Sequence, residues 1–510
     1  MSIEATPGPA GETPEIVEKP GEVWVADTEL RGGSLGLTGA IMQNVTHIAP
    51  AIAAFFFTPT IVGFAGAHSP LAYFIGFLIV LALGSCLVQL ARLFPSAGGY
   101  FTYVSRTVSP RAGFLTAWTY TLYSPIIAGP ILAFFGLILE SELSSNYGVT
   151  FPWWAFTLLA LAFVTALGYY GIQFSVRAIV ILGSIEFLIV LALGLTGLFN
   201  PGPGGFTFSS FNPGFNPGGL ATASGFSLAV VFTVQGLTGW EAAVPLAEET
   251  ENPRRNISIA TMVSILIIGL MLVIVLWGQV IGWGVDDLAK LTESEELPAL
   301  VLGHRLWGGA WFILLLAMLT SVVGASIASQ NVATRMWFGM GRSGALPKQV
   351  AKVHPKHKTP VVALAIQFAI SALLSLVLGG IFGPEKIFVL TVGFVLVISV
   401  IFIYIMANLG VLLYYWRERR HEFNWIYHFV FPVGTSVILV YSLIKSFTPF
   451  PEAPYNWSPA IVGVWILIGC GILVFFKLRG NEEWLAKAVE IAEEKPESPE
   501  EIEKLHDHRV

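Results

Sequence analysis

Two short polar stretches interrupt long apolar segments of this 510-residue chain, and both carry groups that can bind a ligand. In lipid, a continuous helix satisfies its own backbone N–H and C=O groups, so a break at bilayer depth is tolerated only where protein or a watery cavity pairs the freed groups. Two breaks in corresponding positions of two halves are typical of the binding site of a secondary transporter. The stretches consist of Thr46, His47, Ile48, Ala49, Pro50 and Ala51, and of Gln235, Gly236, Leu237, Thr238, Gly239 and Trp240.

The freed backbone groups indicate which ligand the breaks can hold. Amides at the start of a resumed half-helix attract an anion such as an α-carboxylate, and carbonyls at the end of the first half-helix suit an ammonium. A molecule that carries both charges at a fixed spacing fits such a pair, so amino acids are the predicted substrate class. Gly236 and Gly239 would let the backbone approach the substrate closely. No acidic residue lies within either stretch, which favours neutral or hydrophobic amino acids over polyamines.

Three side chains in or beside the breaks each have two interpretations. His47 could titrate near neutrality and influence substrate choice, or it could stay neutral and bond a freed carbonyl. Trp240 could close over the substrate as an aromatic gate, or it could be an ordinary packed tryptophan. Glu241 follows the second break, and an acid at bilayer depth costs about 2.5–3.5 kcal/mol on insertion scales. It is therefore expected either to couple substrate movement to protons or to brace the half-helix.

The composition predicts the environment of these stretches. Hydrophobic residues make up 55% of the chain, charged residues 12%, and the mean hydropathy is +0.72, whereas a soluble domain carries roughly 25% charged residues. We therefore expect an all-α integral membrane protein with twelve transmembrane helices, each formed by a run of about 17–25 apolar residues. The runs are 36–66, 71–93, 112–139, 151–170, 176–199, 226–246, 257–283, 307–337, 361–381, 387–416, 425–447 and 457–476.

The basic residues predict the orientation. With the N-terminus inside, only four of the 27 Lys and Arg residues fall on the outer side, namely Lys290, Arg305, Lys386 and Lys445. Because cytoplasmic loops carry an excess of Lys and Arg, both termini are predicted to be cytoplasmic. The chain is thus expected to be a multi-pass protein of the cell membrane, with the lipid bilayer as its surroundings.

The sequence offers nothing that would bind a cofactor, a metal or nucleic acid. It has no Walker loop, no His/Cys cluster with metal-ligand spacing and no nucleophile elbow. Cys86 and Cys470 lie in apolar runs and form no disulfide framework. The alternative from another class is a polytopic membrane enzyme, which would need polar catalytic residues gathered near one interface. The intramembrane carboxylates are instead scattered, and no filter motif of a channel is visible, so the pattern favours a transporter.

Three stretches resemble motifs of the amino acid–polyamine–organocation (APC) transporter superfamily. ARLFPSAGGY at 91–100 is similar to the loop that follows the family's second helix. GWE at 239–241, followed by EETENPRR at 248–255, is similar to its sixth-helix element. RMWFGMGRSGALP at 335–347, followed by TP at 359–360, is similar to the segment after its eighth helix. The three occur in order across most of the chain, so the resemblance points to an amino acid permease.

The resemblance implies a leucine-transporter-type fold: a 5+5 inverted repeat with discontinuous helices 1 and 6, plus two peripheral helices. The implied function is secondary active transport of amino acids by alternating access and proton-coupled symport. Sodium-coupled symport and amino acid/polyamine exchange are the alternatives, and the oligomeric state is not predicted. The expected parts are a disordered cytoplasmic tail at 1–33, the first repeat at 34–199, an outer loop at 200–224, the second repeat at 225–416, helices 11 and 12 at 417–478, and a cytoplasmic tail at 479–510.

The resemblance also singles out Glu186. GIQFSVR at 171–177 is similar to the family's entry to helix 5, after which some proton-coupled members carry a lysine at the position of Glu186. In those relatives the ammonium lies between helices 1 and 8, where Ser326 and Ser329 are the candidates here. Because burial disfavours a charged carboxylate, Glu186 is predicted to be the proton carrier. The alternatives are a sodium ligand and a protonated group that bonds a helix 1 carbonyl.

Overall fold

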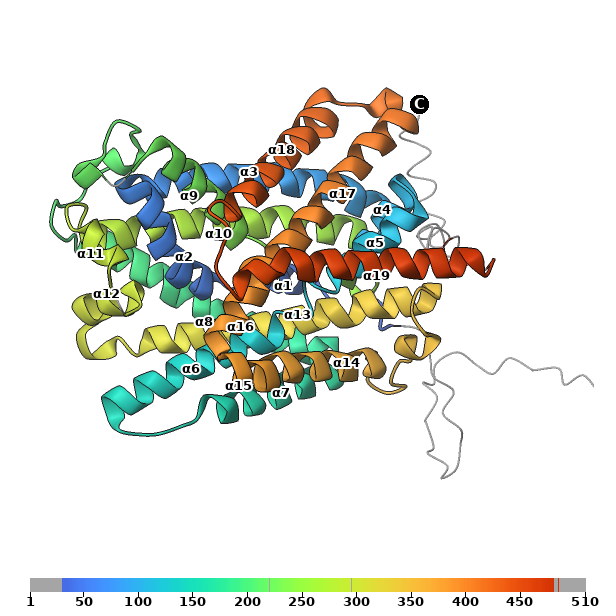
Figure 1. Cartoon of the computed structure of the whole chain (residues 1–510), viewed down its shortest axis with the longest axis horizontal. Helices are drawn as coiled ribbons and strands as arrows, with labels where there is room; N and C mark the ends of the chain where they lie inside the picture. Colours follow the sequence, from blue (N-terminus) through green and yellow to red (C-terminus); the bar gives the residue numbers. More distant parts are fainter. Residues whose placement is uncertain (1–29, 220, 295, 481–484, 486–510) are drawn as a thin grey trace, which may run out of the picture.

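The computed structural model describes residues 30–219, 221–294, 296–480 and 485. Within these ranges the protein is helical and has no β-strand beyond isolated bridges of Leu35 with Thr250 and of Val353 with Pro360 (Figure 1). The prediction of an all-α protein is therefore confirmed. The tails expected at 1–33 and 479–510 lie almost entirely outside the described residues.

Nine helical segments of the described chain are long and apolar enough to cross a membrane, and two shorter apolar helices accompany them. The protein is thus a multi-pass membrane protein. The nine are 37–93, 128–147, 172–199, 253–283, 313–343, 361–382, 384–417, 426–446 and 455–478, and the shorter two are Trp153–Tyr169 and Ala223–Gly236.

The individual helices have the following bounds. The first part of the chain forms α1 (Leu37–Ile48), α2 (Pro50–Ala65), α3 (Ser69–Leu93), α4 (Tyr100–Thr107), α5 (Pro110–Tyr120), α6 (Ala128–Tyr147), α7 (Trp153–Tyr169) and α8 (Ile172–Phe199). The second part forms α9 (Ala223–Gly236), η4 (Val244–Glu249), α10 (Pro253–Trp283), α11 (Leu288–Thr292), α12 (Pro298–Trp307), α13 (Ile313–Ser343), α14 (Val361–Ala372), α15 (Gly379–Phe382), α16 (Pro384–Phe388), α17 (Leu396–Arg417), α18 (Phe431–Ser446) and α19 (Ser458–Leu478). Short 3-10 turns join several of these, and π-helical turns continue α14 at Leu373–Leu378 and α16 at Val389–Val395.

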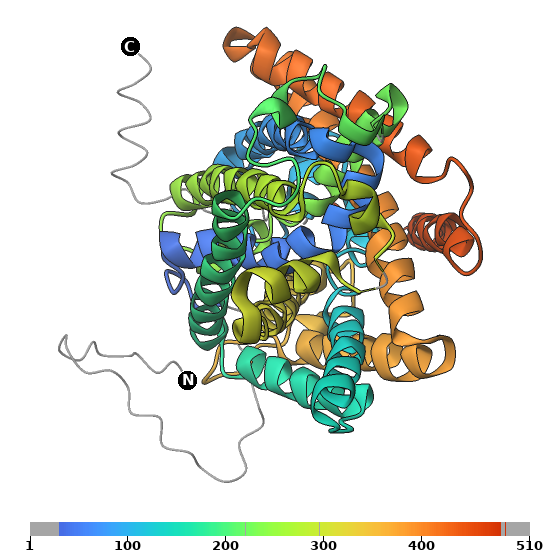
Figure 2. The ribbon, with the colours of Figure 1, turned by 90° about the vertical axis from the view of Figure 1, so that its left-hand side faces the viewer.

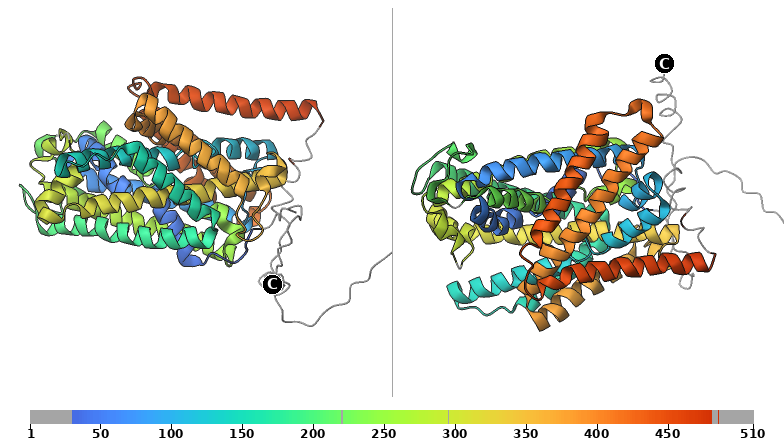
Figure 3. Two further views of the ribbon diagram at one scale, coloured as in Figure 1. Left: turned by 90° about the horizontal axis from the view of Figure 1, so that it is seen from below. Right: turned by 45° about the horizontal axis from the view of Figure 1, so that its top comes forward.

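Burial separates central from peripheral helices. In the most apolar stretch of α13, 78% of the residues are buried, whereas the figure for α19 is 11%. Figures 2 and 3 show α19, drawn in red, at the edge of the molecule, and show α17 and α18 crossing the other helices at a steep angle. Since α19 exposes apolar side chains such as Leu467 and Val464, its outer face suits lipid.

The predicted run 112–139 is not one continuous helix, which corrects that part of the sequence analysis. Residues 121–127 form turns between α5 and α6. The Gln367 side chain of α14 pairs a group that this break frees, because it donates to the Pro125 carbonyl at 3.0 Å, and Ser326 ties the start of α6 to α13 by donating to the Ala128 carbonyl at 2.9 Å. Pro125 cannot donate a backbone hydrogen bond, which explains an end of regular helix near it.

Small residues let α8 and α10 approach each other closely. A methyl group added to Gly278 of α10 would overlap the backbone carbonyl of Gly194 on α8, and one added to Gly194 would lie 2.6 Å from the Cα atom of Val275. Close approach of backbones at glycine is a common basis of helix association in membranes.

We predict that Gly278→Ala lowers the stability of the protein, because the added methyl group must push the two helices apart. Overpacking of this kind costs about 1–3 kcal/mol. The measurement is the apparent melting temperature in detergent. Gly434→Ala on α18 is the matched control, since nothing lies within 4 Å of the added group. Equal melting temperatures for the two variants would contradict the close α8–α10 contact.

Candidate substrate-binding site

The first predicted break lies between α1 and α2. Ala49 adopts a left-handed conformation with φ 56°, and Pro50 is the first residue of α2. Proline lacks an N–H and disfavours a helical conformation of the residue before it, so the chain stops one helix here and starts another. The Ala49 N–H donates to the Thr46 carbonyl at 3.1 Å, and the Ala53 N–H donates to the Ala49 carbonyl at 2.8 Å.

The second predicted break lies between α9 and η4, at residues 237–243. Gly239 has φ 118°, which only glycine adopts without strain. The Asn44 side chain ties this break to α1, because its Oδ1 accepts from the Ala243 N–H at 2.7 Å. The structure brings the two breaks together, since a methyl group on Gly239 would lie 2.6 Å from His47 Nδ1.

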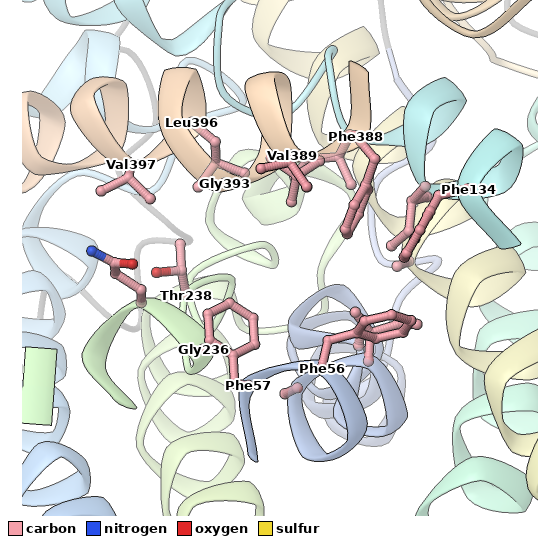
Figure 4. A pocket seen from close by; sticks show the side chains of 18 of the residues that line it. Phe56, Phe57, Phe134, Gly236, Thr238, Phe388, Val389, Gly393, Leu396 and Val397 are labelled. Atoms are coloured by element: carbon pink, nitrogen blue, oxygen red, sulfur yellow. The ribbon is translucent and has the colours of Figure 1, made fainter. Parts of the chain in front are cut away.

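A cavity of about 500 Å³ lies against both breaks. Of the residues predicted to bind substrate, His47, Ile48, Ala49, Gln235, Gly236 and Thr238 line it, whereas Thr46, Pro50, Ala51, Leu237, Gly239 and Trp240 are not among its lining residues. Residues of α2, α6, α9, α13 and the 384–397 segment form most of the remaining lining, and Figure 4 shows Phe134, Val389, Gly393 and Val397 across from the breaks.

Aromatic rings dominate the cavity, a feature that the sequence analysis did not find. Phe134 stacks on Phe388 with ring centroids 4.5 Å apart, and Phe56 lies 5.0 Å from Phe134 (Figure 4). Phe57 also points into the cavity. In the sequence, the only sign of this lining was the run Phe55–Phe57. Because a membrane helix is apolar on all sides, its hydrophobic pattern does not tell which residues face a cavity and which pack against other helices.

The polar lining is sparse and nearly neutral. Among the described residues that line the cavity there is no Lys or Arg, and the single acid is Glu385, which is exposed at the rim. Both ring nitrogens of His47 are buried without a hydrogen-bond partner in the described chain, so His47 does not bond a freed carbonyl here. Its ring lies 5.8 Å from that of Tyr123, edge to face.

Glu241 lies behind the cavity wall, within a cluster of tyrosines. The carboxyl group is fully buried, and its Oε2 accepts from the Tyr404 hydroxyl at 2.9 Å. Tyr123, which lines the cavity, faces the same carboxyl group. Trp240 packs against Tyr404 with ring centroids 5.3 Å apart, away from the cavity lining. In this structure Trp240 is therefore a packed residue and does not cover the cavity.

Glu186 is also fully buried, and it reaches the first break. Its Oε1 accepts from the Ala51 N–H at 2.7 Å, and Ser321 of α13 faces the same carboxyl group. The predicted serines lie elsewhere on α13: Ser326 donates to the Ala128 and Val322 carbonyls, and the Ser329 hydroxyl is buried without a partner among the described residues. Glu186 thus bonds a freed amide at the break rather than a freed carbonyl.

Two ion pairs join η4 to one end of α13 and close the packing between them. Arg335 donates two hydrogen bonds to the Glu249 carboxylate, at 2.8 and 3.2 Å, and both side chains are buried. Arg342 pairs with Glu248, which is partly exposed. Leu35, ahead of α1, exchanges backbone hydrogen bonds of 2.9 Å with Glu249 and Glu251 on the same segment. Arg335 follows the lining residue Ala325 along α13, so this closure lies roughly 15 Å from the cavity.

Together, these features define a multi-pass helical membrane protein with two adjoining helix breaks and a cavity against both. The chain belongs to the amino acid permease family, whose model matches residues 39–486. This confirms the resemblance inferred from the three motifs.

Named relatives indicate what such proteins carry. The low-affinity putrescine importer PlaP of Escherichia coli strain K12 is 25% identical over 402 residues, which cover 76% of this chain and 82% of PlaP. The amino acid permease YecA of Bacillus subtilis, of uncharacterised function, is 26% identical over 69% of this chain and 76% of its own. The serine/threonine exchanger SteT of B. subtilis is 21% identical over 65% of this chain and 74% of its own.

We predict that Gly239→Ala removes ligand binding, because the added methyl group would collide with His47 and force a strained conformation at φ 118°. A positive φ costs a residue with a side chain about 1–2 kcal/mol. The measurement is the shift in melting temperature that a transported ligand produces. Gly463→Ala on α19 is the control, since nothing lies within 4 Å of its added methyl group and the residue does not line the cavity. An undiminished ligand shift in Gly239→Ala would remove this glycine from the site.

Proposed function

We propose that this protein is a secondary active transporter that carries amino acids, or amines related to them, across the cell membrane by alternating access. The adjoining breaks on a cavity are the observation that carries the proposal, because unpaired backbone in the middle of a membrane is tolerated where it serves a binding site. Membership of the amino acid permease family supports it.

The proposed membrane topology has twelve spans. This proposal counts the nine long segments and the two shorter apolar helices, and it divides 37–93 into one span of α1 and α2 and another of α3. In this scheme the two five-helix repeats are 34–199 and 225–416, joined by the loop at 200–224, and the spans at 417–478 are peripheral. The marginal burial of α19 agrees with a peripheral place.

Both termini are proposed to be cytoplasmic, on the strength of the basic residues in the loops. The ion pairs Glu249–Arg335 and Glu248–Arg342 then lie at the inner end, and Glu385 at the rim faces outward. With the inner end closed by these pairs, the structure corresponds to a state in which the cavity is reached from outside. Inward opening would require both pairs to part.

Coupling to protons is proposed to use Glu186. The carboxyl group contacts the first break through Ala51 and the central helix α13 through Ser321, so a change in its protonation is felt by both elements. Sodium-coupled symport is the alternative, in which the unpaired oxygens of Glu186 and Thr46 would contribute ligands. Exchange is a further alternative, since one relative is named a serine/threonine exchanger. Glu241, held by Tyr404, is proposed to brace the second break.

The test of the transport function is uptake into proteoliposomes. The purified protein should give saturable uptake of a labelled amino acid or amine, and vesicles loaded with the unlabelled compound should show counterflow. A channel gives no counterflow and a membrane enzyme gives no flux, so either result would contradict the proposal. A melting-temperature screen against the twenty amino acids and common amines would select the labelled compound, because a ligand that binds only the folded state stabilises it.

We predict that Glu186→Gln abolishes proton-driven accumulation, because glutamine cannot take up and release a proton. Uptake is measured with imposed proton and sodium gradients for the wild type and the variant. Glutamine keeps an oxygen that can accept from the Ala51 N–H, so binding and counterflow should persist. Glu241→Gln serves as the matched control and should keep proton-driven uptake. Equal proton-driven accumulation by wild type and Glu186→Gln would show that Glu186 is not the coupling residue.

A further inference from the structure

The start of α2 is the place where a substrate carboxylate would bind, because the first amides of a helix lack intrahelical partners and attract an anion. Here that place is occupied by the protein itself. Pro50 has no N–H, the Ala51 N–H donates to Glu186 at 2.7 Å, and the Ala53 N–H donates to the Ala49 carbonyl. Of the first four residues of α2, only Ile52 retains an amide for a ligand.

The second break is occupied in the same way. The N–H groups of Leu237, Thr238, Ala242 and Val244 donate to backbone carbonyls, and that of Ala243 donates to Asn44. The amides of Gly239 and Glu241 face the Glu241 carboxyl group. Most amides of the two breaks therefore donate to acceptors of the chain itself, and two of these acceptors are the carboxyl groups of Glu186 and Glu241.

The cavity offers a carboxylate few donors beyond the side chains of Gln235 and Thr238 and the His47 ring, whose nitrogens have no hydrogen-bond partner among the described residues. No Lys or Arg lines it among the described residues, so a buried carboxylate would find no cationic side chain to pair with. The same lining suits an amine. Aromatic faces such as those of Phe56 and Phe388 attract a cation, and Glu385 places a negative charge at the rim. The polar end of the cavity, at Gln235 and Thr238, offers oxygens to an ammonium group.

We propose that Glu186 is a specificity-determining residue: its carboxyl group fills the anion position at the start of α2, so the transporter takes amines without a carboxylate and excludes their amino acid counterparts. This inference rests on the proposed transport function and narrows its substrate class. Glu186 contacts the wall of the cavity from behind, since Ala49 and Ile52 on either side of the Pro50–Ala51 pair line the cavity.

The test compares pairs of compounds that differ only by the α-carboxylate. Phenethylamine is matched with phenylalanine and putrescine with ornithine, and each is measured by melting-temperature shift and by inhibition of counterflow. The amine of at least one pair should bind ten-fold or more tightly than its amino acid. A preference for the amine below ten-fold in both pairs would overturn the inference while leaving the transport function intact. Absence of counterflow with any amine or amino acid would overturn both.

A variant pair tests whether Glu186 is the cause. Glu186→Ala frees the Ala51 N–H, so the ratio of amine to amino acid affinity should fall at least ten-fold, through a gain in amino acid binding. Glu186→Gln is the control, because its amide oxygen still accepts from Ala51 and the ratio should stay near that of the wild type. Glu186→Ser, which also cannot reach Ala51, gives the same test if the alanine variant does not fold. An unchanged ratio in a folded Glu186→Ala or Glu186→Ser protein would overturn the assignment.

Discussion

An unpaired backbone group inside a membrane must find a partner, and this requirement organises the structure. The protein interrupts three of its apolar segments, at Ala49, at 121–127 and at 237–243. Each interruption frees amides and carbonyls that water would satisfy in a soluble protein but lipid cannot. Side chains from distant segments supply the partners, and this explains why buried polar residues occur in helices that are otherwise apolar.

The partners come in a consistent pattern. Glu186 and Asn44 each accept from an amide of a break, at Ala51 and Ala243. Gln367 donates to the Pro125 carbonyl and Ser124 donates to the Ser329 carbonyl, which ties the third break to α14 and α13. Because each of these bonds joins a break to a distant segment of the chain, the breaks are also points at which separate helices are locked to one another. Under the proposed function, a substrate in the cavity would touch the elements that must rearrange for alternating access.

Sequence reasoning located the first two breaks because proline and glycine have strong local effects on the backbone. Pro50 and Gly239 lie where the predicted interruptions occur, and the all-helical class followed from composition. The third break escaped prediction, since Pro125 alone could equally have kinked a continuous helix. The aromatic lining also escaped, because Phe134 and Phe388 meet only in three dimensions. The family resemblance could place Glu186 near the first helix. It could not show that Ala51 is its partner or that Ser321 is the nearby serine, because these contacts also form only in three dimensions.

The backbone link between Leu35 and η4 has a kinetic consequence. Leu35 donates to the Glu249 carbonyl and accepts from the Glu251 N–H, on the segment that also carries the Glu249–Arg335 pair. Hydrogen bonds thus join the start of α1 to the end of η4, so neither can move away without the other. In the proposed cycle, opening on that side would move the two as one unit away from α13 and would break the buried, bidentate Glu249–Arg335 pair, which makes it a step with a high enthalpic barrier. The speed of the whole cycle would then rise steeply with temperature.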